Sequence, residues 1–316
     1  MNTTNKYPPA AIGEMIGALE TQLGMRVVSL YMHGDGNWFP DIAIPLYDAL
    51  EEIGKQEQLA FYLRGVGGRS EVPWRIVALL REFADNLTIL VPEFALSGAT
   101  HVAISADRLI MGALSTLGPV DPQSTHPTLP YGPKGQQARV SVQDLHEFIE
   151  FATQTAGTRR AKAFIRKVFP FLMDEVNPLA IGTIRRASML SRDITRRVLL
   201  TRNPAPSDLE IAQVSEALAA RFWSHSFPVT RIEAEEELGL PVEVAPDELW
   251  ATMIDMLRTL RDQGAQVSLE GTGEAQVRVS CNGLIDSRES RWVYLAKATA
   301  KEGKQIGVFW LRHANT

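Results

Sequence analysis

One serine of the chain occupies a position where nucleophilic chemistry is feasible. Ser97 lies in "FALSGAT" (94–100), between the apolar run "LTILVP" (87–92) and the start of a helical pattern. At a helix N-terminus, free backbone amides and the positive end of the helix dipole coincide. A serine there could attack a carbonyl carbon while the amides stabilise the resulting oxyanion. The alternative is that Ser97 only caps the helix.

Two turns could shape a site around this serine. In "GVGG" (65–68), Gly67 and Gly68 would let a carbonyl oxygen approach the main chain, although a simple tight turn explains them equally well. "MGALSTLGPVDPQ" (111–123) places Asp121 in a rigid turn between two prolines. Neither turn, nor "HGDG" (33–36), has the spacing of a dinucleotide or phosphate-binding loop. We therefore expect no nucleotide cofactor.

The elements that must position these residues alternate between strand and helix. Apolar, β-branched runs predict strands at 26–32, 59–65, 87–92 and 108–112, with helical periodicity between them. This order predicts a parallel sheet covered on both faces. After Pro119 the pattern is helical, and the last part of the sequence predicts one helix followed by four antiparallel strands. We expect a domain at 1–240, with an N-terminal helix at about 10–24, and a small α+β appendage at 241–316.

Two longer stretches carry a family resemblance. "ADRLIMGALSTLGPVDPQ" (106–123) and "FWSHSFPVTRIEAEEELGLPVE" (222–243), together with the strand, Gly-Gly and helix order, resemble the Clp protease/crotonase superfamily. Within it, the chain is most similar to the serine dehydrogenase proteinases, relatives of signal peptide peptidase A. The resemblance extends from Val27 to Val242 and implies an α/β fold with a Clp protease/crotonase-like core of ββα units and a helical layer.

The resemblance implies a cytoplasmic serine endopeptidase. Ser97 would be the nucleophile that forms an acyl-enzyme with a peptide or protein substrate. The amides of Gly68 and Gly98 would form the oxyanion hole, and Gly67 and Asp121 would shape the site. No metal and no cofactor are expected.

The base that would activate the serine has two candidates. A Ser-Lys dyad, as in the signal peptide peptidase relatives, points to Lys134, but sliding the match by a few residues brings Arg139 there, which cannot act as a base. A Ser-His-Asp triad, as in Clp protease, points to His126, since Asp121 stands about where the Clp histidine would be. His101 is expected to be a packed histidine.

Departures from the family pattern leave other functions open. The order Ser-Gly-Ala-Thr and "GVGG" in place of Pro-Gly-Gly keep a catalytically inactive scaffold or interaction protein as an alternative. A crotonase-like acyl-CoA enzyme is a further alternative, which the "GPVDPQ" turn disfavours.

Charge is strongly segregated along the chain. The net charge is -5, yet residues 157–203 carry +8 and the remainder -13. Such a basic segment could meet an anionic partner or a membrane surface, or form one side of a subunit contact. We favour the contact and expect a homo-oligomer (trimer, hexamer or similar), because oligomers are usual in the superfamily. Nucleic acid is not expected, since no aromatic residues are interleaved for base stacking.

The expected compartment is the cytoplasm, with a peripheral membrane position as the alternative. The first residues lack a signal-peptide pattern, and no run of about 18 apolar residues occurs. The single cysteine, Cys281, fits a reducing compartment and is expected to be a buried structural thiol.

Overall fold

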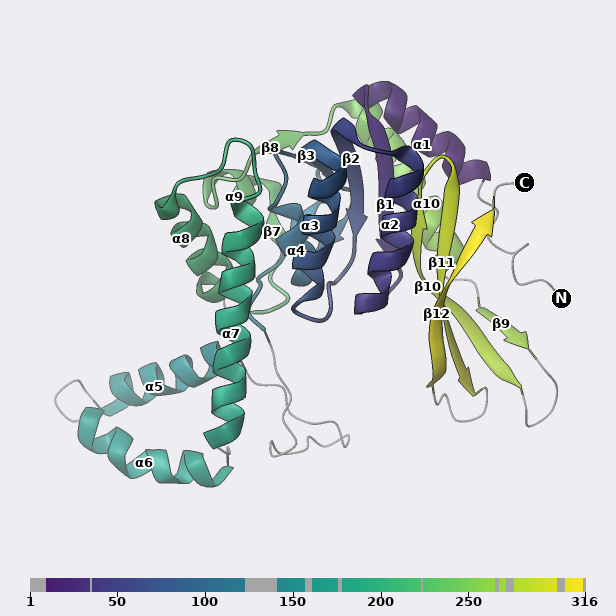
Figure 1. Cartoon of the computed structure of the whole chain (residues 1–316). Helices are drawn as coiled ribbons and strands as arrows, with labels where there is room; N and C mark the ends of the chain where they lie inside the picture. Colours follow the sequence, from purple (N-terminus) through teal and green to yellow (C-terminus); the bar gives the residue numbers. More distant parts are fainter. Residues whose placement is uncertain are drawn as a thin grey trace.

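A large mixed sheet forms the centre of the molecule (Figure 1). The computed structural model describes residues 10–34, 36–122, 141–156, 161–175, 178–222, 224–264, 267–270, 276–299 and 305–314. The strand order is β12-β11-β10-β1-β2-β3-β5-β8, and β9 pairs with β10. The parallel strands are β1 (Arg26–Met32), β2 (Gln56–Arg64), β3 (Ala84–Val91), β5 (Arg108–Met111) and β8 (Val242–Val244). The predicted α/β class and its parallel sheet are confirmed.

Both faces of this sheet are buried, as continuous apolar strands require. In β1, Val28 and Leu30 belong to the core that includes α2 (Ala43–Ile53) and α3 (Val72–Phe83). Val27 and Tyr31, one residue out of phase, belong to the core that includes α1 (Ala10–Leu23) and α10 (Asp247–Gly264). Successive side chains of β1 therefore pack into two different cores, one on each face of the sheet.

A small second sheet adjoins the carboxyl end of β2 through a parallel bridge between Gly65 and Ala95, and it consists of three two-residue strands. These are β4 (Phe94–Ala95), β6 (Thr116–Leu117) and β7 (Val229–Thr230), in the order β4-β6-β7. β4 and β6 are parallel, whereas β7 runs antiparallel to β6. The short helix α4 (Gly98–Ala103) begins three residues after β4 ends.

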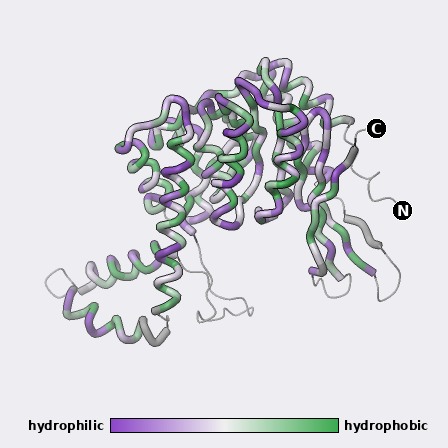
Figure 2. The backbone as a smooth tube through the Cα atoms, in the orientation of Figure 1, coloured by the Kyte–Doolittle hydropathy of each residue, from purple (hydrophilic) through white to green (hydrophobic). Residues whose placement is uncertain are grey.

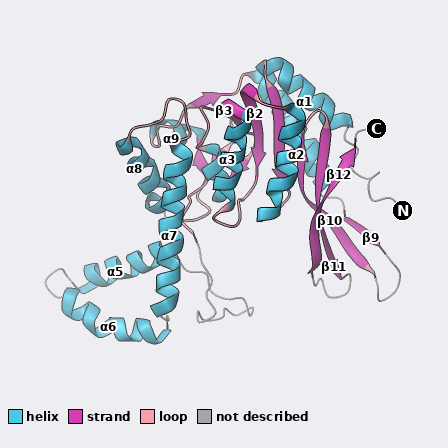
Figure 3. Ribbon diagram, viewed as in Figure 1, coloured by secondary structure: helices cyan, strands magenta, loops and turns pink. Residues whose placement is uncertain are grey.

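The helical layer predicted after Pro119 is present (Figure 3). It comprises α5 (Val142–Ala156), α6 (Ala161–Glu175), α7 (Pro178–Leu199), α8 (Asp208–Glu216), the π-helical turn η3 (Ala217–Arg221) and α9 (Arg231–Glu236). Capping boxes begin α8 and α9, with Ser207 and Thr230 as the capping residues. α7 packs against α3 and α4.

The C-terminal strands continue the central sheet. They are β9 (Val267–Glu270), β10 (Val277–Asp286), β11 (Ser290–Thr299) and β12 (Gln305–Ala314). β10 pairs antiparallel with β1, and α10 packs beside α1. α10 and these strands are the helix and antiparallel strands expected for residues 241–316. They are joined to the sheet that contains β1, and the domain boundary at residue 240 stays a prediction. Cys281 is buried there, and burial raises the pKa of its thiol to about 12.

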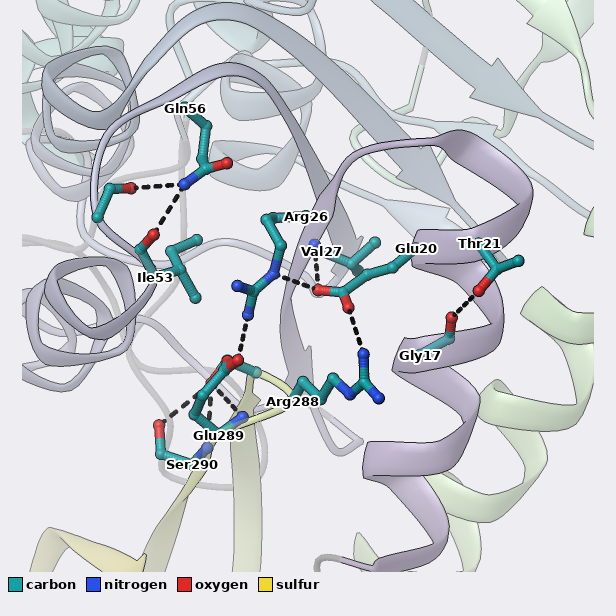
Figure 4. A network of polar contacts seen from close by, with 12 residues as sticks. Gly17, Glu20, Thr21, Arg26, Val27, Ile53, Gln56, Arg288, Glu289 and Ser290 are labelled. Atoms are coloured by element: carbon teal, nitrogen blue, oxygen red, sulfur yellow. Dashed lines mark hydrogen bonds and ion pairs between the residues drawn. The ribbon is translucent and has the colours of Figure 1, made fainter.

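An ionic network fastens this junction (Figure 4). Arg26, at the start of β1, donates from Nε to Glu20 of α1 at 2.7 Å and also pairs with Glu289 in the β10–β11 turn. Glu20 also accepts from the backbone N–H of Val27 at 3.2 Å and lies 3.7 Å from Arg288. One carboxylate therefore joins the N-terminal helix, the first parallel strand and the C-terminal hairpin.

Candidate active site

Ser97 occupies a strained turn. The carbonyl of Leu96 accepts a hydrogen bond from the N–H of Ala99 at 2.9 Å, and Ser97 has φ 50° and ψ -116°. These are the angles of the second residue of a type II′ turn, which is usually glycine. Among the described residues, Ser97 is the one non-glycine with positive φ. Such strain of about 1–3 kcal/mol per residue concentrates at active sites.

The hydroxyl of Ser97 does not cap the helix. Its side chain makes no capping hydrogen bond to α4 and is half-buried. Since a capping role would require that bond, the capping alternative is not supported. Ser97 directly precedes the first amides of α4.

Buried Thr100 ties this turn to the small sheet. Its Oγ1 lies 2.7 Å from the carbonyl oxygen of Ala95 and 2.9 Å from that of Gly118, and it accepts from the N–H of Gly118 at 3.1 Å. A hydroxyl has one proton, so it donates to one of the two carbonyls at a time. The ends of β4 and β6 are thereby held together next to Ser97.

A second chain segment lies against the turn. The N–H of Trp38 donates to the carbonyl of Gly67 at 2.8 Å, and the carbonyl of Trp38 accepts from the N–H of Arg69 at 3.1 Å. In this parallel bridge, Trp38 bonds to the backbone groups of the residues before and after Gly68. The N–H of Gly68 itself therefore points away from Trp38. Neither Gly68 N–H nor Gly98 N–H donates to any residue that the structure describes.

Glycine is required in both segments because their main chains touch. A Cβ on Gly67, whose φ is 79°, would lie 2.4 Å from the nitrogen of Gly98. A Cβ on Gly98 would lie 3.4 Å from the nitrogen of Gly68, and one on Gly68 only 2.3 Å from the nitrogen of Trp38. The two free amides are therefore neighbours beside Ser97.

An acid–histidine pair lies at the same end of the small sheet. His225 Nδ1 is 2.7 Å from Asp121 Oδ1, and both side chains are partly buried. Ser97 follows β4 by two residues and Asp121 follows the parallel strand β6 by four, while His225 precedes the antiparallel strand β7 by four. All three residues therefore lie beyond the same end of the small sheet. A Cβ on Gly118 would lie 3.4 Å from Cα of Leu96, so the segment leading to Asp121 passes the serine turn.

The sequence alone does not predict this pairing. "FWSHSFPVT" contributed to the resemblance, but nothing in it marks His225 as a partner of Asp121, which is 104 residues away. The pairing becomes visible only when β6 and β7 are joined. The candidate bases Lys134 and His126, and the alternative Arg139, lie outside the described residues.

His101 is a packed histidine, as predicted. Its Nε2 lies 3.2 Å from the carbonyl oxygen of Ser191 and 3.1 Å from Oγ1 of Thr195, both in α7. Burial lowers its pKa to about 4, so it is neutral at ordinary pH. Over the described part of the chain, no group of three or more His, Cys, Asp or Glu side chains could hold a metal ion.

Comparisons with known proteins bear on this site. Two uncharacterised proteins of Methanocaldococcus jannaschii are 24% and 23% identical to the chain. The first match spans 60% of this chain and 76% of the relative, and the second spans 68% and 64%.

Two solved structures are similar at 14% identity. An alanine mutant of the 1510-N membrane-bound stomatin-specific protease has a TM-score of 0.38, covering 77% of this chain and 87% of that one. A mutant of ClpP1 from Listeria monocytogenes has a TM-score of 0.37, with coverages of 73% and 99%.

The family comparison covers the segment that contains the serine turn. The model of the ClpP-like SDH-type serine proteinases matches residues 49–131, from α2 past Asp121. The predicted resemblance is therefore confirmed: over these residues the chain is similar to the ClpP-like SDH-type serine proteinases.

Proposed function

We propose that the protein is a serine peptidase in which Ser97 is the nucleophile and His225, oriented by Asp121, is the general base. The observation that carries this proposal is the Asp121–His225 pair at the end of the small sheet where the strained turn of Ser97 lies. The match to a serine proteinase family over residues 49–131 supports the reaction class.

The hydrogen bond between the acid and the histidine fixes the direction of proton transfer. If His225 donates from Nδ1 to the Asp121 carboxylate, its Nε2 has a free lone pair that can accept the proton of Ser97. Ser97 Oγ then attacks the peptide carbonyl carbon, and the proton moves to His225 Nε2. Asp121 stabilises the imidazolium that forms.

The two free amides complete the reaction. The tetrahedral oxyanion accepts hydrogen bonds from the N–H groups of Gly68 and Gly98, which have no other described acceptor. His225 returns the proton to the leaving amine as the C–N bond breaks, leaving an ester on Ser97. A water molecule, deprotonated by His225, hydrolyses the ester and frees the second product.

We further propose peptide or protein substrates and a cytoplasmic location for this peptidase. The family match supports the substrate class. The single, buried cysteine is compatible with a reducing compartment.

Fluorophosphonate labelling tests the assignment, because the reagent reacts with activated serines. Wild type should label, Ser97→Ala should not, and His225→Gln and Asp121→Asn should each slow labelling by about 10²–10⁴-fold. His146→Gln, on the exposed face of α5, is the matched histidine control and should label at the wild-type rate.

Two further variants separate the predicted bases. Lys134→Ala and His126→Ala should label normally if His225 is the base. Loss of labelling in Lys134→Ala with retention in His225→Gln would replace the triad by a Ser-Lys dyad. A folded wild type that never labels and cleaves no peptide would favour the inactive scaffold.

A further inference from the structure

The helices α5, α6 and the first part of α7 (178–190) form an arm that projects from the body (Figure 1). The arm exposes many large apolar side chains, and Phe151, Phe171 and Leu179 are each about two-thirds or more accessible, at 67%, 70% and 73%. The others are Ile149, Phe164, Phe169, Met189 and Leu190. Figure 2 shows hydrophobic and hydrophilic stretches alternating along it. A cluster of this kind marks a surface that binds something.

α6 combines this apolar surface with positive charge. At 100° per residue, Phe164 and Phe171 share one side of the helix with Lys167 between them, and Lys162 and Arg166 occupy the other side. All five side chains are exposed. None of the three cations forms an ion pair with a residue that the structure describes. The partner of α6 should therefore offer both an apolar surface and acids.

A groove with these properties lies at the other end of α7. It has a volume of about 980 Å³ and is bounded by the end of α7, α8, η3 and α9. Leu199, Val214, Ala217 and Leu238 line its apolar part. Four glutamates and two arginines line the rest, so acid is in excess: Glu210, Glu216, Glu236, Glu237, Arg202 and Arg221. Glu237 pairs with Arg221 at 3.0 Å, and Glu216 pairs with Arg192 at 2.5 Å. The segment 208–239 contains seven acids and two arginines, a charge of -5.

The arm cannot enter the groove of its own chain. α7 is 22 residues long and carries the arm at its N-terminal end and the groove at its C-terminal end. At 1.5 Å per residue, the helix separates them by about 33 Å. We propose that α6 of one copy docks into the groove between α7, α8 and α9 of a second copy.

An anionic bilayer fits the arm less well than this groove does. α5 lies beside α6 and exposes Asp144, Glu147 and Glu150, which a flat anionic surface would repel. The groove receives α6 alone and leaves α5 outside. No helix in the described ranges is long and apolar enough to cross a bilayer.

The proposed contact is heterologous, because each copy uses its arm on one neighbour and its groove on another. Such a contact repeats around a ring or along a filament. The basic segment and the acidic remainder found in the sequence would then be the two halves of one interface. The inference does not depend on the chemistry of Ser97.

Charge reversal tests the pairing by sedimentation of the full chain. Wild type should sediment as an oligomer. Lys162→Glu, Arg166→Glu and Lys167→Glu together should raise the apparent dissociation constant at least about tenfold, and Glu236→Lys with Glu237→Lys should do the same. Combining both sets in one chain should restore assembly. Glu147→Lys with Glu150→Lys on α5 makes the same charge change as the groove variant and should assemble normally.

Mixing the two defective proteins tests the head-to-tail geometry. The unaltered arm of one protein matches the unaltered groove of the other, and the reversed arm matches the reversed groove. An equimolar mixture should therefore assemble with the two proteins alternating, whereas each protein alone should not assemble. As a second measurement, a Phe171→Cys chain mixed with an Ala220→Cys chain, each with Cys281→Ala, should form a disulfide between chains. Within one chain, α7 holds the two positions too far apart for a disulfide.

Three results would overturn the proposal. One is a wild type that stays monomeric and gives no cross-link in the paired cysteine experiment. Another is an oligomer that both charge-reversal sets leave intact. The third is binding to phosphatidylserine vesicles that the arm variant loses and the groove variant keeps, in a protein that is otherwise monomeric; this would assign the arm to a lipid surface.

Discussion

Replacing Ser97 by glycine is expected to make the protein more stable than replacing it by alanine. The turn holds this position at φ 50° and ψ -116°, where a Cβ is strained by about 1–3 kcal/mol. Glycine removes that strain but adds about 0.5–1 kcal/mol of unfolded-state entropy. The net difference should be about 0.5–2 kcal/mol in favour of Ser97→Gly. Neither variant has a nucleophile, so catalysis does not enter the comparison.

The assay is thermal and urea unfolding of the two variants side by side. A difference of about 1 kcal/mol should raise the melting temperature of Ser97→Gly by about 2–4 °C. Ala163→Gly on the exposed side of α6 is the control, and it should lower stability by about 0.5–1 kcal/mol because its backbone is helical. If Ser97→Gly is no more stable than Ser97→Ala, the backbone at Ser97 is not strained and that argument for a site fails.

Three more changes probe the surroundings of the serine. Gly68→Ala should destabilise the protein by more than about 2 kcal/mol and abolish fluorophosphonate labelling, because the added Cβ would lie 2.3 Å from the nitrogen of Trp38. A Gly68→Ala variant that is stable and labels normally would contradict this packing. Thr100→Val should lower the free energy of unfolding in urea by about 1–3 kcal/mol, because it leaves buried backbone groups unpaired. Thr21→Val, at an exposed position of α1, should lower it little, and equal effects of the two changes would refute the role of Thr100. His101 has a pKa of about 4 in the folded protein, against an ordinary value of 6.5. As the pH falls, the unfolded state therefore binds a proton at this residue before the folded state does. The free energy of unfolding should fall by about 3 kcal/mol between pH 6.5 and pH 4. In His101→Gln this part of the pH dependence should vanish, and an unchanged pH profile would count against a buried neutral histidine.

Local patterns were sufficient to predict the elements that hold the serine turn. β1 and β3 are apolar on both faces, so their sequences are continuous hydrophobic runs. The capping boxes at Ser207 and Thr230 are also local signals, because each needs only four residues. The start of a helix at Ser97 is predicted for the same reason, because small residues follow a buried strand.

Pairings between distant segments could not be predicted in this way. The C-terminal strands alternate like any antiparallel set, and nothing in "VRVSCNGLID" specifies β1 as the neighbour of β10. The resemblance points to bases that follow β6 in sequence, Lys134 and His126, and these stay predictions. The pair of Asp121 with His225, which precedes the antiparallel strand β7, is a contact between distant segments that the sequence does not indicate.

The contacts around the small sheet explain how it can hold the Asp121–His225 pair. Strands of two residues have little stability alone, so β4, β6 and β7 depend on what surrounds them. Thr100 joins the first two, and the capping box of Thr230 anchors β7 to α9. Phe222 and Phe227 stack across the loop that carries His225, with ring centroids 4.9 Å apart. His225 therefore lies between an aromatic stack and an anchored strand. The proposed role of general base would need such fixed positioning, which the immediate sequence of His225 does not reveal.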